Sequence, residues 1–333
     1  MTLEKQSKIG TEPSLFAVKQ FSLVFRQYEK GWQESKIQAI SGFNLTIQKG
    51  EIVAIVGASG SGIVGASGSG KSLLANAILG ILPENAETDG EILFEGEALT
   101  FEGEALTPKR QEELRGKEIA LIPQSTNALD PLMKAGKQVQ TMIKGKNKKK
   151  IQEGIFHKVG LASEAGERYP FELSGGMARR VLVTTAIASQ AKLIIADEPT
   201  PGLDEHSRNE TIQYIKQLAN EGKGVMFITH DIMAALAIAD RIAVFYAGQT
   251  VEIANTEDFY GKGEQLRHPY TKALWNSLPQ NEFKPLPGSQ PAPITVLNGC
   301  AFAPRCLKAT SICKQKQPLN RSLNQGMVRC FHA

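Results

Sequence analysis

The chain has 333 residues, of which 41% are hydrophobic and 22% charged, and its 38 basic and 34 acidic side chains leave a net charge of +4. These values are typical of a folded globular protein, and they exclude a disordered or collagen-like chain. The sequence contains no run of 18 apolar residues that could span a membrane, and its N-terminal segment lacks the apolar core of a secretory signal. We therefore expect a cytosolic protein of about two structural units.

Short β-branched runs alternate with helical patterns through the body of the chain. Five of these runs are apolar along almost their whole length, as expected for strands that are buried on both faces of a parallel sheet. They are residues 51–56, 118–122, 192–196, 224–228 and 241–245. Residues 205–220 and 232–240, which lie between these runs, have helical patterns. The alternation predicts a three-layer α/β domain.

The strongest motif is GASGSGKS at 65–72, which fits the G-x-x-x-x-G-K-[ST] pattern of a phosphate-binding loop. It follows a predicted strand and precedes a helical run, which is unlike an isolated flexible Gly/Ser turn. Lys71 would supply a positive charge for the β- and γ-phosphates, and Ser72 a hydroxyl for Mg²⁺. The motif predicts nucleotide contacts from Gly65, Ser67, Gly68, Ser69, Gly70, Lys71 and Ser72.

Two identical tandem repeats interrupt this part of the chain. IVGASGSG occurs at 55–62 and 63–70, and FEGEALT occurs at 94–100 and 101–107. Periods this short do not match a solenoid unit. An insertion beside a phosphate loop is also hard to build, because the loop must leave its strand directly. We interpret the repeats as an artefact of the sequence record, and we expect one phosphate loop joined directly to its strand.

Two further motifs follow in an informative order. LSGGM at 173–177 places the hydroxyl and N–H groups of Ser174, Gly175 and Gly176 at an expected helix start, where they can face an anion. LIIADE at 193–198 is a buried strand that ends in two carboxylates, at the edge where doubly wound sheets bind ligands. Asp197 can hold Mg²⁺, and Glu198 can polarise an attacking water. Paired acids also occur as solvated strand ends, and the phosphate loop upstream favours the catalytic interpretation.

Together these three motifs resemble the ATP-binding subunit of an ABC transporter, and the resemblance covers residues from about 14 to 333. It implies a P-loop ABC cassette at 14–260, with a RecA-like core, an antiparallel β subdomain and a helical subdomain at about 123–173. It also implies a small Cys-rich C-terminal extension at 261–333.

The resemblance assigns roles to three residues that follow predicted strands or motifs. Gln124 resembles the Q-loop glutamine, which senses Mg²⁺ and water and faces the membrane partner. Asp204 resembles the D-loop aspartate, and His230 resembles the switch histidine that contacts the γ-phosphate. A glutamine in a loop is usually only solvated, and a histidine after a strand is more often structural. Their order and spacing favour the functional roles, so Glu198, His230 and Gln124 form the expected catalytic set.

Other parts of the chain match the family pattern less closely. Phe25 resembles the aromatic residue that stacks on adenine, with Tyr28 as a weaker candidate, although Phe25 can equally be a core residue. Arg179 and Arg180 follow the signature where a Gln-Arg pair is common. PGLD at 201–204 also replaces the commoner sequence of a small residue followed by Ala-Leu-Asp. Neither of these two departures removes a group with a direct chemical role.

The C-terminal segment narrows the family. HPYTKALWNSLP at 268–279, followed by a Pro-rich spacer and an acid-free tail, resembles the extension of ATPases that drive di- and oligopeptide importers, with nickel importers as close relatives. The tail contains all the cysteines of the chain, Cys300, Cys306, Cys313 and Cys330. Their spacing alone leaves an iron–sulfur cluster, a zinc site and free thiols open. The resemblance implies a [4Fe–4S] cluster on these four residues, with zinc as the alternative.

We therefore expect a peripheral ATPase at the cytoplasmic face of the membrane that binds ATP and Mg²⁺ and drives di- or oligopeptide import. In the family, two such subunits pair head to tail, with ATP between the phosphate loop of one and the signature of the other. The implied partners are a homologous second ATPase, two permease subunits and an extracytoplasmic solute-binding protein. No nucleic-acid partner is expected. The alternatives are a nickel or metallophore importer, a non-transporting cassette protein, or a tail whose main role is iron or redox sensing.

Overall fold

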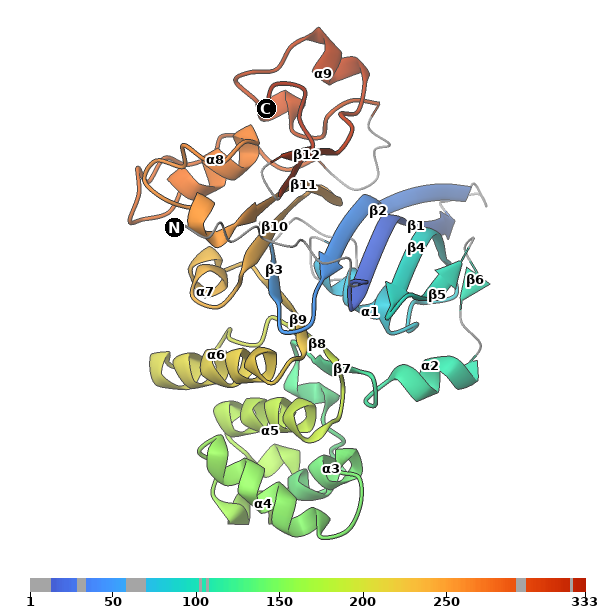
Figure 1. Cartoon of the computed structure of the whole chain (residues 1–333), viewed down its shortest axis with the longest axis vertical. Helices are drawn as coiled ribbons and strands as arrows, with labels where there is room; N and C mark the ends of the chain where they lie inside the picture. The colour runs from blue at the N-terminus through green and yellow to red at the C-terminus, as the bar shows by residue number, and fades with distance from the viewer. Residues whose placement is uncertain are drawn as a thin grey trace, which may run out of the picture.

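The computed structural model describes residues 13–28, 34–57, 70–101, 104–105, 108–291, 298–323 and 326–333, and it contains two β-sheets and a helical lobe (Figure 1). The smaller sheet is antiparallel and has the order β2-β1-β4-β5-β6. Its strands are β1 (Phe16–Tyr28), β2 (Glu34–Ile47), β4 (Ala86–Phe94), β5 (Glu97–Phe101) and β6 (Glu104–Ala105). This sheet is the expected antiparallel subdomain.

The larger sheet has the order β12-β13-β11-β10-β3-β9-β8-β7. Its parallel strands are β3 (Ile52–Val56), β7 (Ile119–Ile122), β8 (Leu193–Asp197), β9 (Gly224–Thr229) and β10 (Arg241–Tyr246). Its antiparallel strands are β11 (Gln249–Asn255), β12 (Arg321–Leu323) and β13 (Gly326–Val328). The five strands predicted from apolar runs are confirmed, and they are the five parallel ones.

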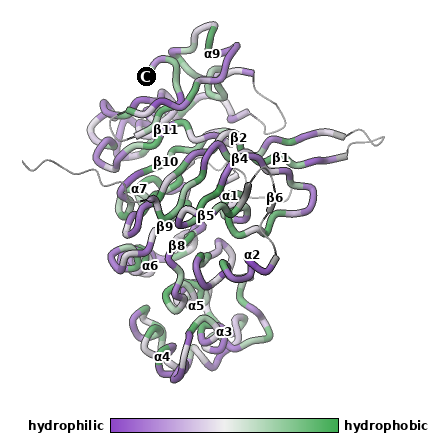
Figure 2. The backbone as a smooth tube through the Cα atoms, turned by 45° about the vertical axis from the view of Figure 1, so that its right-hand side comes forward, coloured by the Kyte–Doolittle hydropathy of each residue, from purple (hydrophilic) through white to green (hydrophobic). Residues whose placement is uncertain are grey.

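Two hydrophobic cores on opposite faces of the larger sheet explain why its strands are apolar throughout. In β3, Val53 and Ile55 belong to the core shared with the smaller sheet and α1 (Lys71–Ile78), whereas the alternate residues Ile52, Ala54 and Val56 belong to the other core. The second core includes residues of α6 (Glu205–Asn220), α7 (Ile232–Leu236) and α8 (Pro269–Asn276). Figure 2 shows this apolar interior as green strands inside a more hydrophilic surround.

The helical lobe has its own core and lies at the lower end of the molecule in Figure 1. It contains α3 (Ala135–Met142), α4 (Lys148–Lys158) and α5 (Gly175–Ala188), and α2 (Pro108–Leu114) precedes it in the chain. α5, which begins after the expected limit of the helical subdomain at about residue 173, also contributes buried residues to this core. The expected domain boundaries stay predictions.

The C-terminal extension is built onto the larger sheet. β13 pairs with β11 through Glu252↔Val328 and Ile253↔Met327, so a strand near the end of the chain is added to the larger sheet. Glu252 is fully buried and accepts hydrogen bonds from the backbone N–H groups of Arg267 (2.8 Å) and His268 (2.9 Å). A 3₁₀ turn (Ala303–Arg305) and α9 (Ser311–Gln315) complete the extension.

The two tandem repeats lie in different parts of the structure. β3 uses the first residues of the first IVGASGSG copy, and α1 begins directly after the second copy. Residues 58–69 lie outside the described residues, so the expected direct joint between strand and phosphate loop stays a prediction. In the other repeat, Thr100 pairs with Ala105, so the two FEGEALT copies pair with each other at the edge of the smaller sheet.

His268 gives the fold a pH dependence that can be measured. Its side chain is buried and accepts a hydrogen bond from the Tyr270 N–H at the start of α8, and burial lowers its pKa from 6.5 to about 3. As the pH falls from about 6.5 towards 3, the unfolded chain takes up a proton that the folded chain does not, so stability is lost. We expect His268→Asn, which keeps an acceptor at the helix start, to remove about 1.4 kcal/mol per pH unit from this slope.

Urea unfolding of both proteins between pH 7 and pH 5 measures the two slopes. Equal slopes would show that His268 does not remain neutral in the folded protein.

Candidate functional site

Two buried carboxylates form the centre of the site. Asp197 ends β8 and Glu198 follows it, and the two residues are only 6% and 7% exposed. Burial raises the pKa of Asp197, while a hydrogen bond from the Ser72 hydroxyl lowers it in part. The Asp197 Oδ1 atom is buried and accepts no hydrogen bond from any residue that the structure describes. A buried carboxylate oxygen of this kind, beside a hydroxyl, fits the ligands that Mg²⁺ prefers.

The backbone turns sharply at Glu198 and directs its side chain towards the end of the next strand. Glu198 adopts φ 46°, in the left-handed region that non-glycine residues rarely enter. Its Oε2 atom lies 2.9 Å from Nδ1 of His230 and 3.4 Å from the Oγ1 atom of Thr229. The His230 side chain itself is half exposed. The pair therefore joins the ends of β8 and β9 at the edge of the sheet.

Lys71 brings a positive charge to the same edge from α1. Its side chain is buried, and its Nζ atom donates a hydrogen bond to the backbone oxygen of Gly57 at 3.1 Å. Burial lowers the pKa of Lys71, and the nearby charges of Glu198 and Asp197 oppose this shift. Gly70, which precedes the helix, has φ 81°, and a Cβ there would lie 3.0 Å from the Ala39 oxygen. Only glycine fits this close approach without strain.

The structure therefore brings together five of the residues that the sequence predicts: Lys71, Ser72, Asp197, Glu198 and His230. Gly70 adjoins them at the start of α1. Gly65, Ser67, Gly68 and Ser69 lie outside the described residues, so their predicted phosphate contacts are untested.

Gln124, Asp204 and Ser174 lie on three other segments of the described chain. Gln124 is exposed just after β7, and Asp204 begins α6 by accepting hydrogen bonds from the backbone and side chain of Ser207. Ser174 begins α5 by accepting a hydrogen bond from the Met177 N–H at 3.3 Å. A Cβ added at Gly175 or Gly176 would meet nothing within 4 Å, so the helix start is open to an approaching group. Their predicted roles stay predictions.

Phe25 lies in β1 and is 7% exposed within the core shared by the two sheets. This burial supports its alternative interpretation as a core residue, and its predicted stacking on adenine stays untested. The side chain of Tyr28 lies outside the described residues.

In the extension, Cys300 and Cys306 each lie near Cys313 and Cys330. Burial raises the pKa values of Cys300 and Cys306, and the nearby thiols of Cys330 and Cys313 raise both further. The Nε2 atom of His332 lies 3.3 Å from the Cys313 sulfur. All four cysteines are free thiols, but in the described part of the chain no group of three His, Cys, Asp or Glu residues has the arrangement of a metal site. Cysteine and histidine side chains are ligands that suit a soft metal, but the positions of these side chains are not those of a formed metal site.

Arg179 is a site residue that the motif search missed. It lies on α5 and is 8% exposed. Asp197 and Glu198 lie close enough for their charges to raise the pKa of Arg179, against the lowering that burial causes. The available signal in the sequence was the charged pair Arg179 and Arg180 between the apolar residues Ala178 and Val181.

Comparisons with known proteins agree with this geometry. Residues 61–201 match the family described as ABC transporter, and residues 251–313 match the family described as oligopeptide/dipeptide transporter, C-terminal region. The oligopeptide transport ATP-binding protein AppD of Bacillus subtilis is 34% identical, over 90% of this chain and 92% of AppD. OppD of the same organism, which carries the same description, is 36% identical, over 91% of this chain and 84% of OppD.

Among solved structures, the chain resembles the ATP-binding cassette MJ0796 in a dimeric post-hydrolysis state bound to ADP and Pi. The TM-score is 0.60 at 26% sequence identity, and the match covers 72% of this chain and 98% of MJ0796. None of the helices that the structure describes combines the length and apolar character needed to cross a bilayer. The similarity over nearly the whole length of curated relatives, together with the acid pair, Lys71 and the matched extension, shows that the chain belongs to the ABC transporter ATP-binding subunits of the oligopeptide and dipeptide type.

Proposed function

We propose that the chain hydrolyses MgATP to power the import of di- or oligopeptides through separate permease subunits. The observation that carries this proposal is the convergence of Lys71, the Ser72–Asp197 pair and the Glu198–His230 pair at one edge of the parallel sheet. This is the set of groups that ATP hydrolysis requires: a phosphate counter-charge, metal ligands and a carboxylate that orients water. The names of the relatives favour peptides over nickel as the transported solute.

Each residue of the cluster has a distinct part in the proposed reaction. Lys71 neutralises the charge of the β- and γ-phosphates, and Ser72 and Asp197 hold the metal ion. Bound Mg²⁺ offsets the negative charge that develops on the phosphate oxygens. Glu198 orients the attacking water and accepts its proton, and His230 fixes the Glu198 carboxylate through its 2.9 Å contact.

The open start of α5 supports a role for a second ATPase subunit. The Ser174 hydroxyl and the N–H groups that follow it can bind phosphate oxygens, because a helix N-terminus carries partial positive charge. A Cβ added at Gly175 or Gly176 would meet nothing within 4 Å, so a phosphate group of a nucleotide bound to a partner can approach this helix start. The resemblance to a dimeric cassette supports the same arrangement. We propose a homologous second chain as that partner, with the whole assembly peripheral to the membrane.

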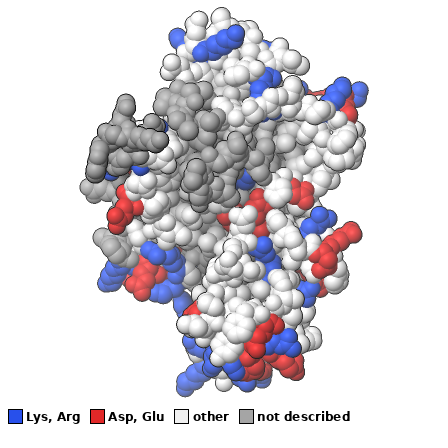
Figure 3. All heavy atoms as spheres, turned by 180° about the vertical axis from the view of Figure 1, so that it is seen from behind, with Lys and Arg blue, Asp and Glu red and all other residues white. Residues whose placement is uncertain are grey.

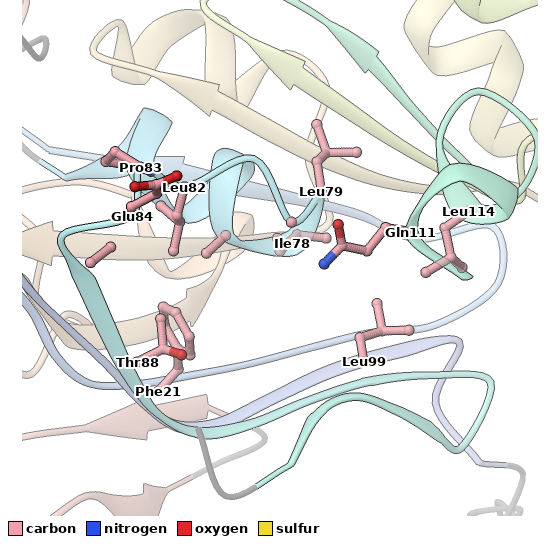
Figure 4. A pocket seen from close by; sticks show the side chains of 13 residues that line it. Phe21, Ile78, Leu79, Leu82, Pro83, Glu84, Thr88, Leu99, Gln111 and Leu114 are labelled. Atoms are coloured by element: carbon pink, nitrogen blue, oxygen red, sulfur yellow. The ribbon is translucent and has the colours of Figure 1, made fainter. Parts of the chain in front are cut away.

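A pocket lined mainly by apolar side chains lies beside α1, the helix that carries Lys71. It has a volume of about 230 Å³ and lies between the end of α1, α2 and the smaller sheet (Figure 4). Ile78, Leu79, Leu99 and Leu114 line it, with Gln111 as a polar group at one side. The pocket therefore lies at the end of α1 opposite Lys71.

We further propose that Cys300, Cys306, Cys313 and Cys330 hold a [4Fe–4S] cluster, with zinc as the alternative metal. Support comes from the proximity of Cys313 and Cys330 to both Cys300 and Cys306, and from the absence of acidic residues after Glu282. In Figure 3 the charged side chains visible at the very top of the molecule, the end at which α9 lies in Figure 1, are basic. A surrounding of positive charge offsets the negative charge of a Cys₄ cluster. The cluster would stabilise a segment that has little core of its own.

We expect Glu198→Gln to bind ATP as the parent does and to lower the rate of hydrolysis by about 10²–10⁴-fold, because an amide is a poor base. Nucleotide titration and steady-state phosphate release measure the two effects separately. Glu112→Gln, an exposed change of the same kind on α2, should leave both unchanged. A Glu198→Gln variant that hydrolyses ATP at the parental rate would remove Glu198 from the reaction.

Anaerobically purified protein should be brown and contain about four irons per chain. Substitution of any one of the four cysteines by serine should bleach the absorbance, because each supplies one thiolate. Metal analysis and absorption spectroscopy provide the measurement. A colourless preparation with stoichiometric zinc would contradict the cluster and identify a zinc site.

A further inference from the structure

The side chain of Arg179 connects the helical lobe to the loop that carries Gln124. Arg179 lies in the second turn of α5, and its guanidinium Nη1 atom donates a hydrogen bond to the Pro123 oxygen at 3.0 Å. Pro123 lies between the end of β7 and Gln124. The contact therefore joins two segments that are 56 residues apart in the chain. A buried guanidinium is costly unless hydrogen bonds and opposite charges compensate it.

The acid pair supplies the opposite charge. Burial lowers the pKa of Arg179, and the carboxylates of Asp197 and Glu198 oppose this shift. Arg179 in turn helps to counter the rise that burial causes in the pKa of Asp197. With Lys71, the site then has two positive charges facing its two carboxylates.

The next residue on α5 has a different environment. The guanidinium of Arg180 donates to the Gly160 oxygen (3.1 Å) and the Ser207 hydroxyl (2.8 Å), and it lies 3.4 Å from the Glu210 carboxylate. These contacts are within the helical lobe and with α6, away from Pro123. Arg180 is therefore a matched control for Arg179, with the same chemistry on the same helix.

We propose that Arg179 is a positioning residue that ties α5 to the Gln124 loop and holds one positive charge beside Asp197 and Glu198. This inference rests on the proposed function, in which the acid pair holds Mg²⁺ and orients water. Because Ser174 begins the same helix, a displacement of α5 by a partner subunit would be transmitted to the Gln124 loop. The fixed charge also weakens the attraction of the acid pair for Mg²⁺ until ATP contributes its own phosphate ligands.

Two substitutions separate the charge of Arg179 from its hydrogen bond. Arg179→Gln removes the charge and keeps a shorter amide donor, whereas Arg179→Lys keeps the charge without the planar set of donors. The measurement is ATP hydrolysis as a function of Mg²⁺ at fixed ATP, together with hydrogen exchange of the peptide that covers residues 119–130.

We expect Arg179→Gln to lower the Mg²⁺ concentration for half-maximal activity about three- to tenfold, because one repelling charge is lost. It should also lower kcat about tenfold and speed exchange in the 119–130 peptide. Arg179→Lys should keep the parental Mg²⁺ midpoint and lose part of kcat. Arg180→Gln should keep the midpoint and the exchange of this peptide within about twofold.

An unchanged Mg²⁺ midpoint and unchanged exchange in Arg179→Gln would overturn the role of Arg179. Equal effects of Arg179→Gln and Arg180→Gln would also overturn it, since they would report only the packing of α5. If Arg179→Gln fails to fold, a shifted Mg²⁺ midpoint in Arg179→Lys would contradict the proposal on its own. A parent protein without Mg²⁺-dependent hydrolysis would instead refute the proposed function.

Discussion

The burial of two adjacent carboxylates at the end of β8 is the constraint on which the rest of the site depends. Taking Asp197 and Glu198 out of water is unfavourable unless positive charge and hydrogen bonds surround them. The compensating groups come from different elements: Lys71 and Ser72 from α1, His230 from the end of β9, and Arg179 from α5. The order β3-β9-β8 places these elements around one edge of the sheet, so the fold itself brings the charged groups of the site together.

The parallel strands could be predicted because each is buried on both faces of the sheet. Such a strand needs apolar residues at every position, and these appear in the sequence as a continuous apolar run. The limits of α7 could not be predicted in the same way. Its pattern extends to residue 240, but the Asp240 carboxylate accepts a hydrogen bond from the Ile52 N–H at 2.8 Å, which ties this residue to the sheet after the helix has ended at Leu236. The pairing of β13 with β11 was also missed, because a three-residue strand carries no periodic signal and its partner is distant in sequence.

The same distinction applies to the site. The acid pair and Lys71 belong to motifs whose order along the chain predicts their meeting at the carboxyl ends of parallel strands. The contact between Glu198 and His230 depends on the left-handed backbone at Glu198, which residue type does not encode. Arg179 could not be identified from a motif, because its importance comes from a hydrogen bond to the Pro123 oxygen, and any residue type could supply such an oxygen.

A structure of the chain with Mg²⁺ and a slowly hydrolysed ATP analogue tests the central claim most directly. The account predicts a metal ion between the Ser72 hydroxyl and the Asp197 carboxylate, and a γ-phosphate within reach of the Lys71 ammonium and the His230 ring. Glu198 should face the γ-phosphate across one water molecule. A metal ion held away from Asp197, or a nucleotide bound elsewhere on the protein, would contradict the assignment of this sheet edge as the site of ATP hydrolysis.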